Sequence, residues 1–260
     1  MRSDSTVDGR SLLESRPVTW TARNPAAAPS ARERLIVALD VPDMTAAQAL
    51  VDTLDDAVEH YKIGLELAMS GRYFELLRWL LDRGKRVFVD LKLYDIPATV
   101  GAAVRQLADR GASLLTVHGE RAVVEAAVAN AGGELAIIAV TVLTSMRQED
   151  LVASGITLDV ASLVRQRART AIAAGAAGVV ASGHEARELR ALLGAEPLIV
   201  TPGIRPAFAA GPDDQARVVT PAMAIAAGAS HIVVGRPIRS AADPRAAAEA
   251  IQGEIATALQ

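Results

Sequence analysis

The feature that most constrains the fold is a regular alternation of two kinds of segment. Short runs of β-branched and aliphatic residues are nearly continuous in apolar character, which is typical of parallel strands buried on both faces. Between them lie segments rich in alanine and leucine with helical spacing, such as residues 44–58 and 72–84. The eight expected strands are RLIVALD (34–40), HYKIG (60–64), RVFVDLKL (86–93), SLLTVHG (113–119), LAIIAVTVL (135–143), GVVASG (178–183), PLIVTPGI (197–204) and HIVVGR (231–236).

Eight strand–helix units in this order predict an α/β protein with a single-domain (β/α)8 TIM barrel. A weak internal repeat supports the prediction, because residues 107–120, 171–185 and 224–237 each run from a helix end through a glycine into a strand and a polar turn. The glycines of this repeat, Gly111 and its two equivalents, suit a helix C-terminus where φ is positive. An open doubly wound sheet is the alternative arrangement of the same elements.

Composition limits the core and the domain boundaries. Hydrophobic residues make up 51% of the 260 residues but aromatic residues only 3%, so the core must be built from alanine, valine, leucine and isoleucine. Residues 1–31 mix charges with serine, alanine and proline and lack the apolar region of a signal peptide. We predict a poorly ordered N-terminal extension over residues 1–31 and a barrel domain over residues 32–260.

Charge and cysteine content exclude several kinds of function. The net charge is −3 and no stretch is strongly basic, so nucleic acid is not an expected partner. No run of about 18 uncharged apolar residues exists, so no membrane span is expected. The chain has no cysteine, which excludes disulfides and thiolate metal sites and fits a reducing compartment. We expect a cytoplasmic protein.

Polar residues follow the expected strands at their C-terminal ends, where barrels carry their chemistry. One of them, Ser182, and Asp43, shortly after the first strand, have a simpler explanation, because both are suited to cap the helices that follow. That explanation does not extend to two lysines expected on the inner faces of neighbouring strands. The polar residues that follow the eight strands are Asp40, Lys62, Asp90 with Lys92, His118, Thr144 with Ser145, Ser182, Arg205 and Arg236.

The lysines suggest a particular chemistry. In "FVDLKLYDIPAT", residues 88–99, Asp90 and Lys92 share one face of a strand. Neighbouring carboxylates favour the ammonium form of a lysine, which makes it a poor Schiff-base nucleophile but a good proton donor and stabiliser of negative charge. The pattern therefore favours a reaction that forms a carbanion or enolate and then protonates it. A purely structural cluster of charges is the alternative.

A metal site is less consistent with these residues. Asp40 and Asp90 could hold Mg²⁺, but Lys62 and Lys92 would lie in the same cavity and repel the ion. The four histidines show no metal-ligand spacing. We expect no metal.

The last two strands indicate an anion site. Each ends in glycine and arginine, in "VTPGIRP" and "VVGRPI". Loops after strands 7 and 8 of a barrel often bind phosphate, and Gly235 with Arg236 would allow close backbone approach and two hydrogen bonds. The following stretch, residues 205–221, has the length and Gly/Pro content of a closing loop.

These motifs together resemble the orotidine 5′-phosphate decarboxylase family. The anchors are VALD, YKIG, DLKLYDIPAT, TVLTSM, TPGIRP, DDQAR and VVGRPI, which fall in the family's order across the whole barrel. One departure is Ala98, where the family often has asparagine. The D-x-K-x-x-D pattern is shared with metal-dependent decarboxylases and aldolases that act on sugar phosphates, but these typically carry glutamate in place of Lys62.

The resemblance implies cofactor-free decarboxylation of orotidine 5′-phosphate to UMP and CO2, the last step of UMP synthesis. It implies catalytic roles for Lys92, Asp90, Lys62 and Asp95. It also implies a homodimer in which Asp95 and Thr99 complete the partner's site. Substrate contacts would come from Asp40 and Lys62 to the ribose, Thr144 and Ser145 to the pyrimidine, and Gln215, Gly235 and Arg236 to the phosphate, with Arg205 also at the site. Two alternatives stay open: a Mg²⁺-dependent sugar-phosphate lyase and a non-catalytic phosphate-binding barrel.

Overall fold

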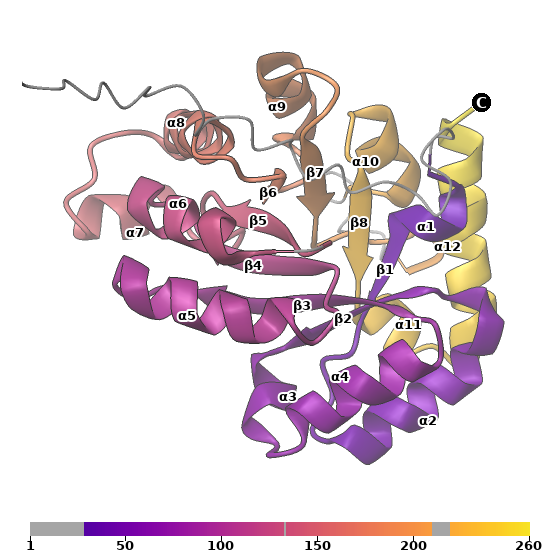
Figure 1. Cartoon of the computed structure of the whole chain (residues 1–260). Coiled ribbons are helices and arrows are strands. Elements are labelled where there is room, and N and C mark those ends of the chain that lie inside the picture. The colour runs from indigo at the N-terminus through magenta and orange to yellow at the C-terminus, as the bar shows by residue number, and fades with distance from the viewer. Residues whose placement is uncertain (1–28, 133, 210–218) are drawn as a thin grey trace, which may run out of the picture.

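A computed structural model describes residues 29–132, 134–209 and 219–260 of the chain. Its strands form one closed, parallel barrel in sequence order, with the first strand paired to both the second and the last (Figure 1). The predicted (β/α)8 barrel is therefore confirmed, and the open sheet is excluded. The strands are β1 (Leu35–Ala38), β2 (His60–Gly64), β3 (Arg86–Leu93), β4 (Leu114–His118), β5 (Ala136–Val140), β6 (Gly178–Val180), β7 (Leu198–Thr201) and β8 (His231–Val234).

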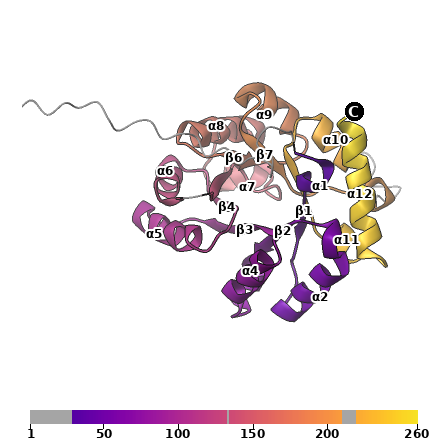
Figure 2. The ribbon, with the colours of Figure 1, turned by 45° about the vertical axis from the view of Figure 1, so that its right-hand side comes forward.

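Helices surround the barrel on the outside (Figure 2). Several begin at side chains that accept a hydrogen bond from the first turn, as Asp43 does from the backbone N–H of Ala46. The helices are α1 (Ala31–Arg34), α2 (Met44–Leu54), α3 (Leu65–Met69), α4 (Tyr73–Asp82), α5 (Pro97–Ala108), α6 (Arg121–Asn130), α7 (Gln148–Ala153), α8 (Val160–Ala173), α9 (Ala186–Leu193), α10 (Pro221–Ala226), α11 (Arg236–Arg239) and α12 (Pro244–Ala258), with short 3₁₀ turns at Asp55–Ala57 and Ala207–Ala209.

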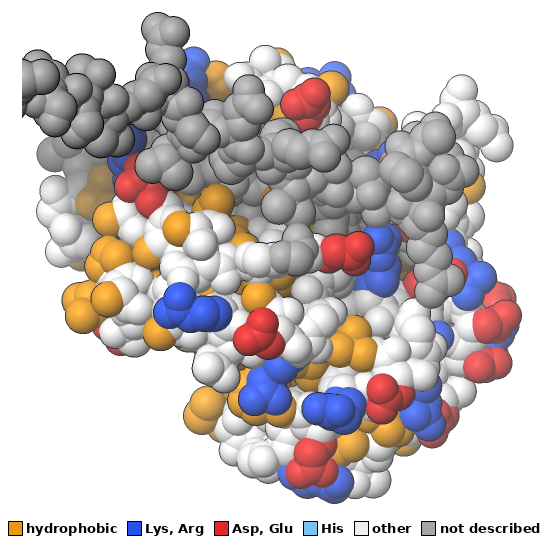
Figure 3. Space-filling model, viewed as in Figure 1, with side chains coloured by type: hydrophobic (Ala, Val, Ile, Leu, Met, Phe, Trp, Pro, Cys, Tyr) orange, Lys and Arg blue, Asp and Glu red, His pale blue; other side chains and the backbone are white. Residues whose placement is uncertain are grey.

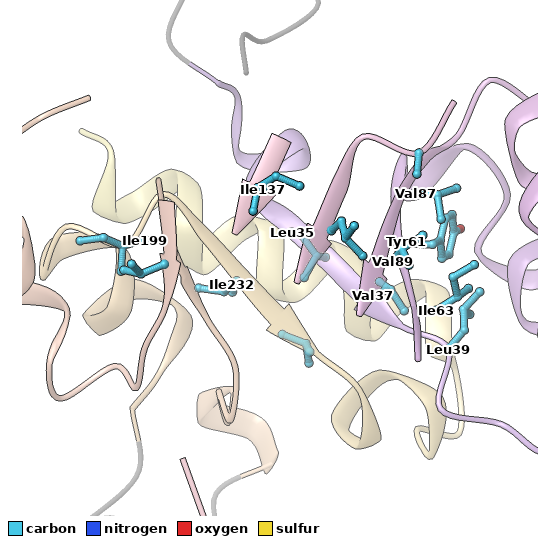
Figure 4. Close-up of a cluster of buried hydrophobic side chains, with 14 of the residues drawn as sticks. Leu35, Val37, Leu39, Tyr61, Ile63, Val87, Val89, Ile137, Ile199 and Ile232 are labelled. Atoms are coloured by element: carbon cyan, nitrogen blue, oxygen red, sulfur yellow. The ribbon is translucent and has the colours of Figure 1, made fainter. Parts of the chain in front are cut away.

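Alternate residues of each strand face the helices or the barrel interior. The larger cluster lies between strands and helices and includes Leu35, Val37, Tyr61 and Ile63 (Figure 4). A smaller cluster fills the interior. It holds a single aromatic side chain, Phe88, which agrees with the core that the composition predicted. Polar side chains at one end of the strands therefore stand on a packed, apolar floor.

The structure matches most expected segment boundaries to within a few residues. Gly111, Gly175 and Gly228 all have positive φ, as predicted, although Gly111 lies one residue further beyond its helix than the other two. Most of the expected N-terminal extension lies outside the described residues. Of its last residues, Ser30 caps α1 and shares a capping box with Glu33.

The face in Figure 3 and the described helices show no feature typical of binding to nucleic acid or crossing a membrane. On the face in Figure 3, basic and acidic side chains are interspersed instead of gathering into a patch of one sign. Among the helices in the described ranges, none has the length and apolar character needed to cross a membrane.

Candidate active site

A cavity of about 490 Å³ opens at the C-terminal ends of the strands. This is the end at which barrels carry their functional residues, so the fold itself explains why side chains from distant sequence positions meet here. The walls combine acidic and basic groups with an apolar floor made by inward-facing strand residues such as Phe88 and Val200. The sequence-predicted residues that line the cavity are Asp40, Lys62, Asp90, Lys92, Thr144, Arg205, Gly235 and Arg236.

Four of these residues form a continuous array of alternating charge. The Lys62 ammonium lies 2.8 Å from Asp40 Oδ1 and 3.5 Å from Asp90 Oδ2. The Lys92 ammonium donates to Asp90 Oδ1 at 2.8 Å. Each lysine thus contacts a carboxylate, which is the condition for holding charged groups inside a cavity. Lys92 is the more accessible lysine, with 32% of its side chain exposed against 10% for Lys62.

Asp90 is the shared partner of both lysines. Burial by itself raises the pKa of this carboxyl group, but the neighbouring ammonium groups of Lys62 and Lys92 and a hydrogen bond from Thr116 outweigh it, so the pKa lies below its ordinary value. Asp90 is therefore an anion at neutral pH. An additional negative group brought beside it would be repelled unless it lost its charge.

Strand β3 departs from regular pairing where it supplies this pair. Val89 pairs with Leu115 of β4, and the next pairing is Leu93 with Val117. Four positions of β3 thus span two positions of β4, which is a bulge in the ladder. Lys92 lies in the bulge with φ at 48°, in the left-handed region that non-glycine residues rarely adopt.

The structure brings one residue to this cluster that sequence analysis did not identify. Thr116 on β4 donates from Oγ1 to Asp90 Oδ1 at 2.9 Å and accepts from the Lys92 backbone N–H at 2.9 Å. It is fully buried. Thr116 lies two positions before His118, so the sequence does place it on the inner face of the expected strand. Its hydrogen bond with Lys92 depends on the bulge in β3, which the sequence pattern does not reveal.

Two glycines leave room for the array and for a ligand. A Cβ atom at Gly64 would lie 3.1 Å from Lys62 Nζ, so a side chain there would press on the ammonium. A Cβ atom at Gly235 would lie 3.4 Å from Ala38 Cβ and 3.7 Å from Asp40 Oδ2. The absence of both side chains keeps the backbone of β2 and the end of β8 open to the cavity.

Two arginines also line the cavity. Arg205 follows β7 and Arg236 begins α11, directly after β8. Arg236 is exposed, so its guanidinium group is accessible to a ligand in the cavity. Two guanidinium groups, in addition to the array of lysines and aspartates, make the cavity suited to a ligand with an anionic end.

Other predicted residues do not line the cavity. Asp95 and Thr99 are exposed at the end of β3 and the start of α5, and Asp95 accepts a hydrogen bond from the Ile96 backbone N–H at 2.6 Å. Ser145 is exposed in the turn after Thr144. Gln215 lies outside the described residues.

Two smaller expectations have different outcomes. Asp43 caps α2, as predicted. The expectation that Ser182 caps the next helix is wrong. The N-cap of α9 is Glu185, three residues later, and the Ser182 backbone N–H donates to the Glu185 carboxylate at 2.8 Å. His118, also expected at the strand ends, packs its ring against Tyr94 at 4.8 Å.

The described part of the chain presents no arrangement of side chains typical of a metal centre. No group of three or more His, Asp or Glu side chains within it is arranged to hold an ion. The carboxylate oxygens of Asp40 and Asp90 face the lysine ammonium groups at short range, which does not suit a divalent cation.

Comparison with known proteins identifies relatives over most of the chain. The family model described as "Orotidine 5'-phosphate decarboxylase / HUMPS family" matches residues 33–251. A protein named orotidine 5'-phosphate decarboxylase from Methylococcus capsulatus is 54% identical over 223 residues, which cover 86% of this chain and 92% of the relative. One of the same name from Afipia carboxidovorans is 53% identical over 242 residues, covering 93% of this chain and all of the relative.

A solved structure agrees with these relatives. The crystal structure of orotidine 5'-phosphate decarboxylase from Lactobacillus acidophilus superposes with a TM-score of 0.76 at 36% identity, covering 85% of this chain and 98% of that one. The closed barrel with a charged cavity at its C-terminal end, together with these relatives, defines the class: an enzyme built on a (β/α)8 barrel. The chain belongs to the orotidine 5′-phosphate decarboxylase family.

Proposed function

We propose that the protein decarboxylates orotidine 5′-phosphate to UMP and CO2, in pyrimidine biosynthesis and without a cofactor. The observation that carries the proposal is the Asp40–Lys62–Asp90–Lys92 array inside a cavity that also presents two arginines. The names of relatives at 53–54% identity support the same substrate.

The array suits this reaction because negative charge develops at one carbon. As the bond from C6 to the carboxylate breaks, its electron pair stays on C6 and CO2 leaves. The Lys92 ammonium stabilises that charge and then gives its proton to C6. Asp90 would lie near the substrate carboxylate, so that repulsion between two anions is relieved as CO2 departs.

The remaining cavity residues are proposed to hold the substrate. Asp40 and Lys62 would bind the ribose hydroxyls, with Lys62 also completing the charged array. Thr144 and Ser145 would contact the pyrimidine. The phosphate would be bound by Arg236, the Gly235 backbone and Gln215, with Arg205 beside them. The two arginines that line the cavity and the missing Cβ atom at Gly235, next to Arg236, support a phosphate site at the ends of β7 and β8.

A homodimer is part of the proposal, with Asp95 and Thr99 reaching the partner's cavity. Both residues are exposed and stand outside the cavity of their own chain. Exposed apolar side chains flank Asp95, since Tyr94 is 63% and Ile96 66% exposed. Apolar groups of this size gathered around a turn suit a protein interface.

The substrate assay tests the proposed function directly. Purified protein should consume orotidine 5′-phosphate, followed by the loss of its ultraviolet absorbance, and should form UMP and CO2 in equal amounts. Activity should persist after dialysis against EDTA, because the lysines occupy the positions near the carboxylates that a divalent cation would need. Loss of activity in EDTA with recovery in Mg²⁺ would favour the metal-dependent lyase. Phosphate-ester binding without turnover would favour a binding protein.

A further inference from the structure

The bulge in β3 creates a structural problem that one side chain resolves. Between its pairings with Leu115 and Val117, β3 carries more residues than β4 can match. The Lys92 backbone N–H lies within this stretch, and it donates to the Thr116 side chain at 2.9 Å instead of following the regular ladder. A buried N–H group without an acceptor would cost free energy, so the hydroxyl is needed at this point.

The same hydroxyl also holds the catalytic carboxylate. Thr116 Oγ1 donates its proton to Asp90 Oδ1 at 2.9 Å. That oxygen is the one that accepts from the Lys92 ammonium at 2.8 Å. A hydroxyl has one proton to donate and lone pairs to accept, and here both capacities are used at once. Thr116 therefore contacts Lys92 at its backbone and, through Asp90, at its ammonium group.

Its surroundings leave this hydroxyl little freedom. Thr116 has no exposed surface. The residues on either side of it in β4, Leu115 and Val117, are fully buried between the barrel and the helices. A β-branched side chain has few χ1 rotamers, so its oxygen is held at a fixed place. Lys92, by contrast, has an unusual φ and a long flexible side chain.

We propose that Thr116 is a positioning residue for decarboxylation, which aligns the Asp90 carboxylate and the Lys92 ammonium by bonding to both residues across the β3 bulge. The inference rests on the proposed function. Thr116 does not line the cavity, so it acts through the two residues that do. Reacting groups must be held to within about 0.5 Å for full rate, and the hydroxyl supplies that constraint on the least regular part of β3.

The test compares two substitutions that differ in the hydroxyl. Thr116→Val keeps the side-chain shape and removes the hydroxyl, whereas Thr116→Ser keeps the hydroxyl. We expect kcat for orotidine 5′-phosphate to fall about 10- to 100-fold in Thr116→Val, the range for losing a hydrogen bond to a charged group. The KM and the dissociation constant of UMP should change less than about threefold, because the binding residues are untouched. Thr116→Ser should recover most of the lost kcat.

A matched control separates positioning from general loss of stability. Thr141 is also a buried threonine, and its hydroxyl donates to the Val180 carbonyl at 2.9 Å, away from the charged array. Thr141→Val should lower the melting temperature about as much as Thr116→Val does, with kcat near that of the wild type.

Several results would overturn the inference. These are a kcat for Thr116→Val within about twofold of the wild type, a Thr116→Ser variant as impaired as Thr116→Val, or an equal loss of kcat in Thr141→Val. If Thr116→Val does not fold, as judged by circular dichroism, Thr116→Ala provides a second variant without the hydroxyl. A wild-type protein that does not turn over orotidine 5′-phosphate would contradict the proposed function itself, and that result is seen before any variant is made.

Discussion

At the scale of single residues, the cavity shows how charges are kept inside a protein. Asp90 is largely buried, and it is stable as an anion because two ammonium groups and a threonine hydroxyl surround it. Replacing any one partner leaves the others without part of their compensation. Substitutions here should therefore act on rate and on stability, and only measurements that separate the two are informative.

Lys92→Ala should remove the proposed proton donor and one proposed stabiliser of the negative charge on C6. General acid catalysis alone is worth about 10²- to 10⁴-fold, so kcat should fall by at least that range while UMP binds with a similar dissociation constant. Single-turnover kinetics and UMP titration by calorimetry measure the two quantities. A kcat close to the wild-type value would remove Lys92 from the mechanism.

Arg236→Ala should weaken binding of the phosphate group. A charge-assisted contact to a dianion is worth about 1.5–3 kcal/mol, so KM should rise about 10- to 100-fold. Arg239→Ala is the matched control, since this arginine lies on the same short helix but does not line the cavity. Unchanged UMP affinity in Arg236→Ala would place the phosphate elsewhere.

At the scale of elements, strands β2 and β8 each have a charged cavity at one end and a buried histidine at the other. Their C-terminal ends lead into the cavity, whereas their first residues, His60 and His231, lie fully buried with ring centroids 6.1 Å apart. Burial lowers the pKa of His60 to about 3, with a smaller contribution from the charge of Arg86. Burial likewise moves the pKa of His231 well below its ordinary value. Both rings are neutral in the folded protein at pH 7.

These histidines should make stability depend on pH. The unfolded chain binds their protons below its pKa of about 6.5, whereas folded His60 binds one only near pH 3, so the stabilisation is complete above pH 6.5 and is lost as pH falls. Below pH 6.5, each histidine should lower the free energy of unfolding by about 1.4 kcal/mol for every pH unit that the pH falls. Urea unfolding at pH 7.5, 6.0 and 5.0 measures the slope.

Substitution identifies which histidine carries the slope. His60→Gln should reduce the slope of the unfolding free energy against pH by about 1.4 kcal/mol per pH unit, which corresponds to one proton. This change in slope is independent of any effect of the substitution on stability at pH 7.5. His184→Gln is the control, because His184 lies in the turn before α9, outside the barrel core. An identical slope in His60→Gln and the wild type would show that His60 does not titrate differently on folding.

At the scale of the whole molecule, the proposed active site uses two chains. Lys92 lines the cavity of its own chain, whereas Asp95 is proposed to complete the cavity of the partner chain. The separation is built into one segment, since β3 ends between these residues and α5 begins two positions after Asp95. A single short sequence would thus couple catalysis to assembly.

Mixing two inactive variants tests the shared site. Lys92→Ala and Asp95→Ala homodimers should each be nearly inactive, but a mixed dimer should hold one site with both defects and one with neither. With equal amounts and free exchange, about half of the dimers are mixed, so about a quarter of wild-type activity should return. Native mass spectrometry verifies exchange. If mixed dimers form without recovering activity, Asp95 acts within its own chain.

The sequence allowed much of the fold and the charged array to be predicted, for a simple reason. Parallel strands buried on both faces leave a strong apolar pattern, and in a barrel their C-terminal ends must converge, which brought Asp40, Lys62 and Asp90 together. Thr116 was missed because its role depends on the β3 bulge, and a change of register leaves no periodic signal. Ser182 was misassigned because a serine after a strand also occurs in turns that precede a helix start.

Because β1 pairs with β8, the sheet cannot close until nearly all of the chain has been synthesised. The guanidinium of Arg34 donates to the carbonyl of Ser230, across 196 positions of sequence. During translation, the edge of β1 that pairs with β8 in the native barrel therefore stays unpaired until β8 has been made. Such an edge is a template for pairing with other chains. Closure is expected to be a late, slow event in folding, and a nascent barrel lacking its last strand is expected to be the species most prone to aggregate.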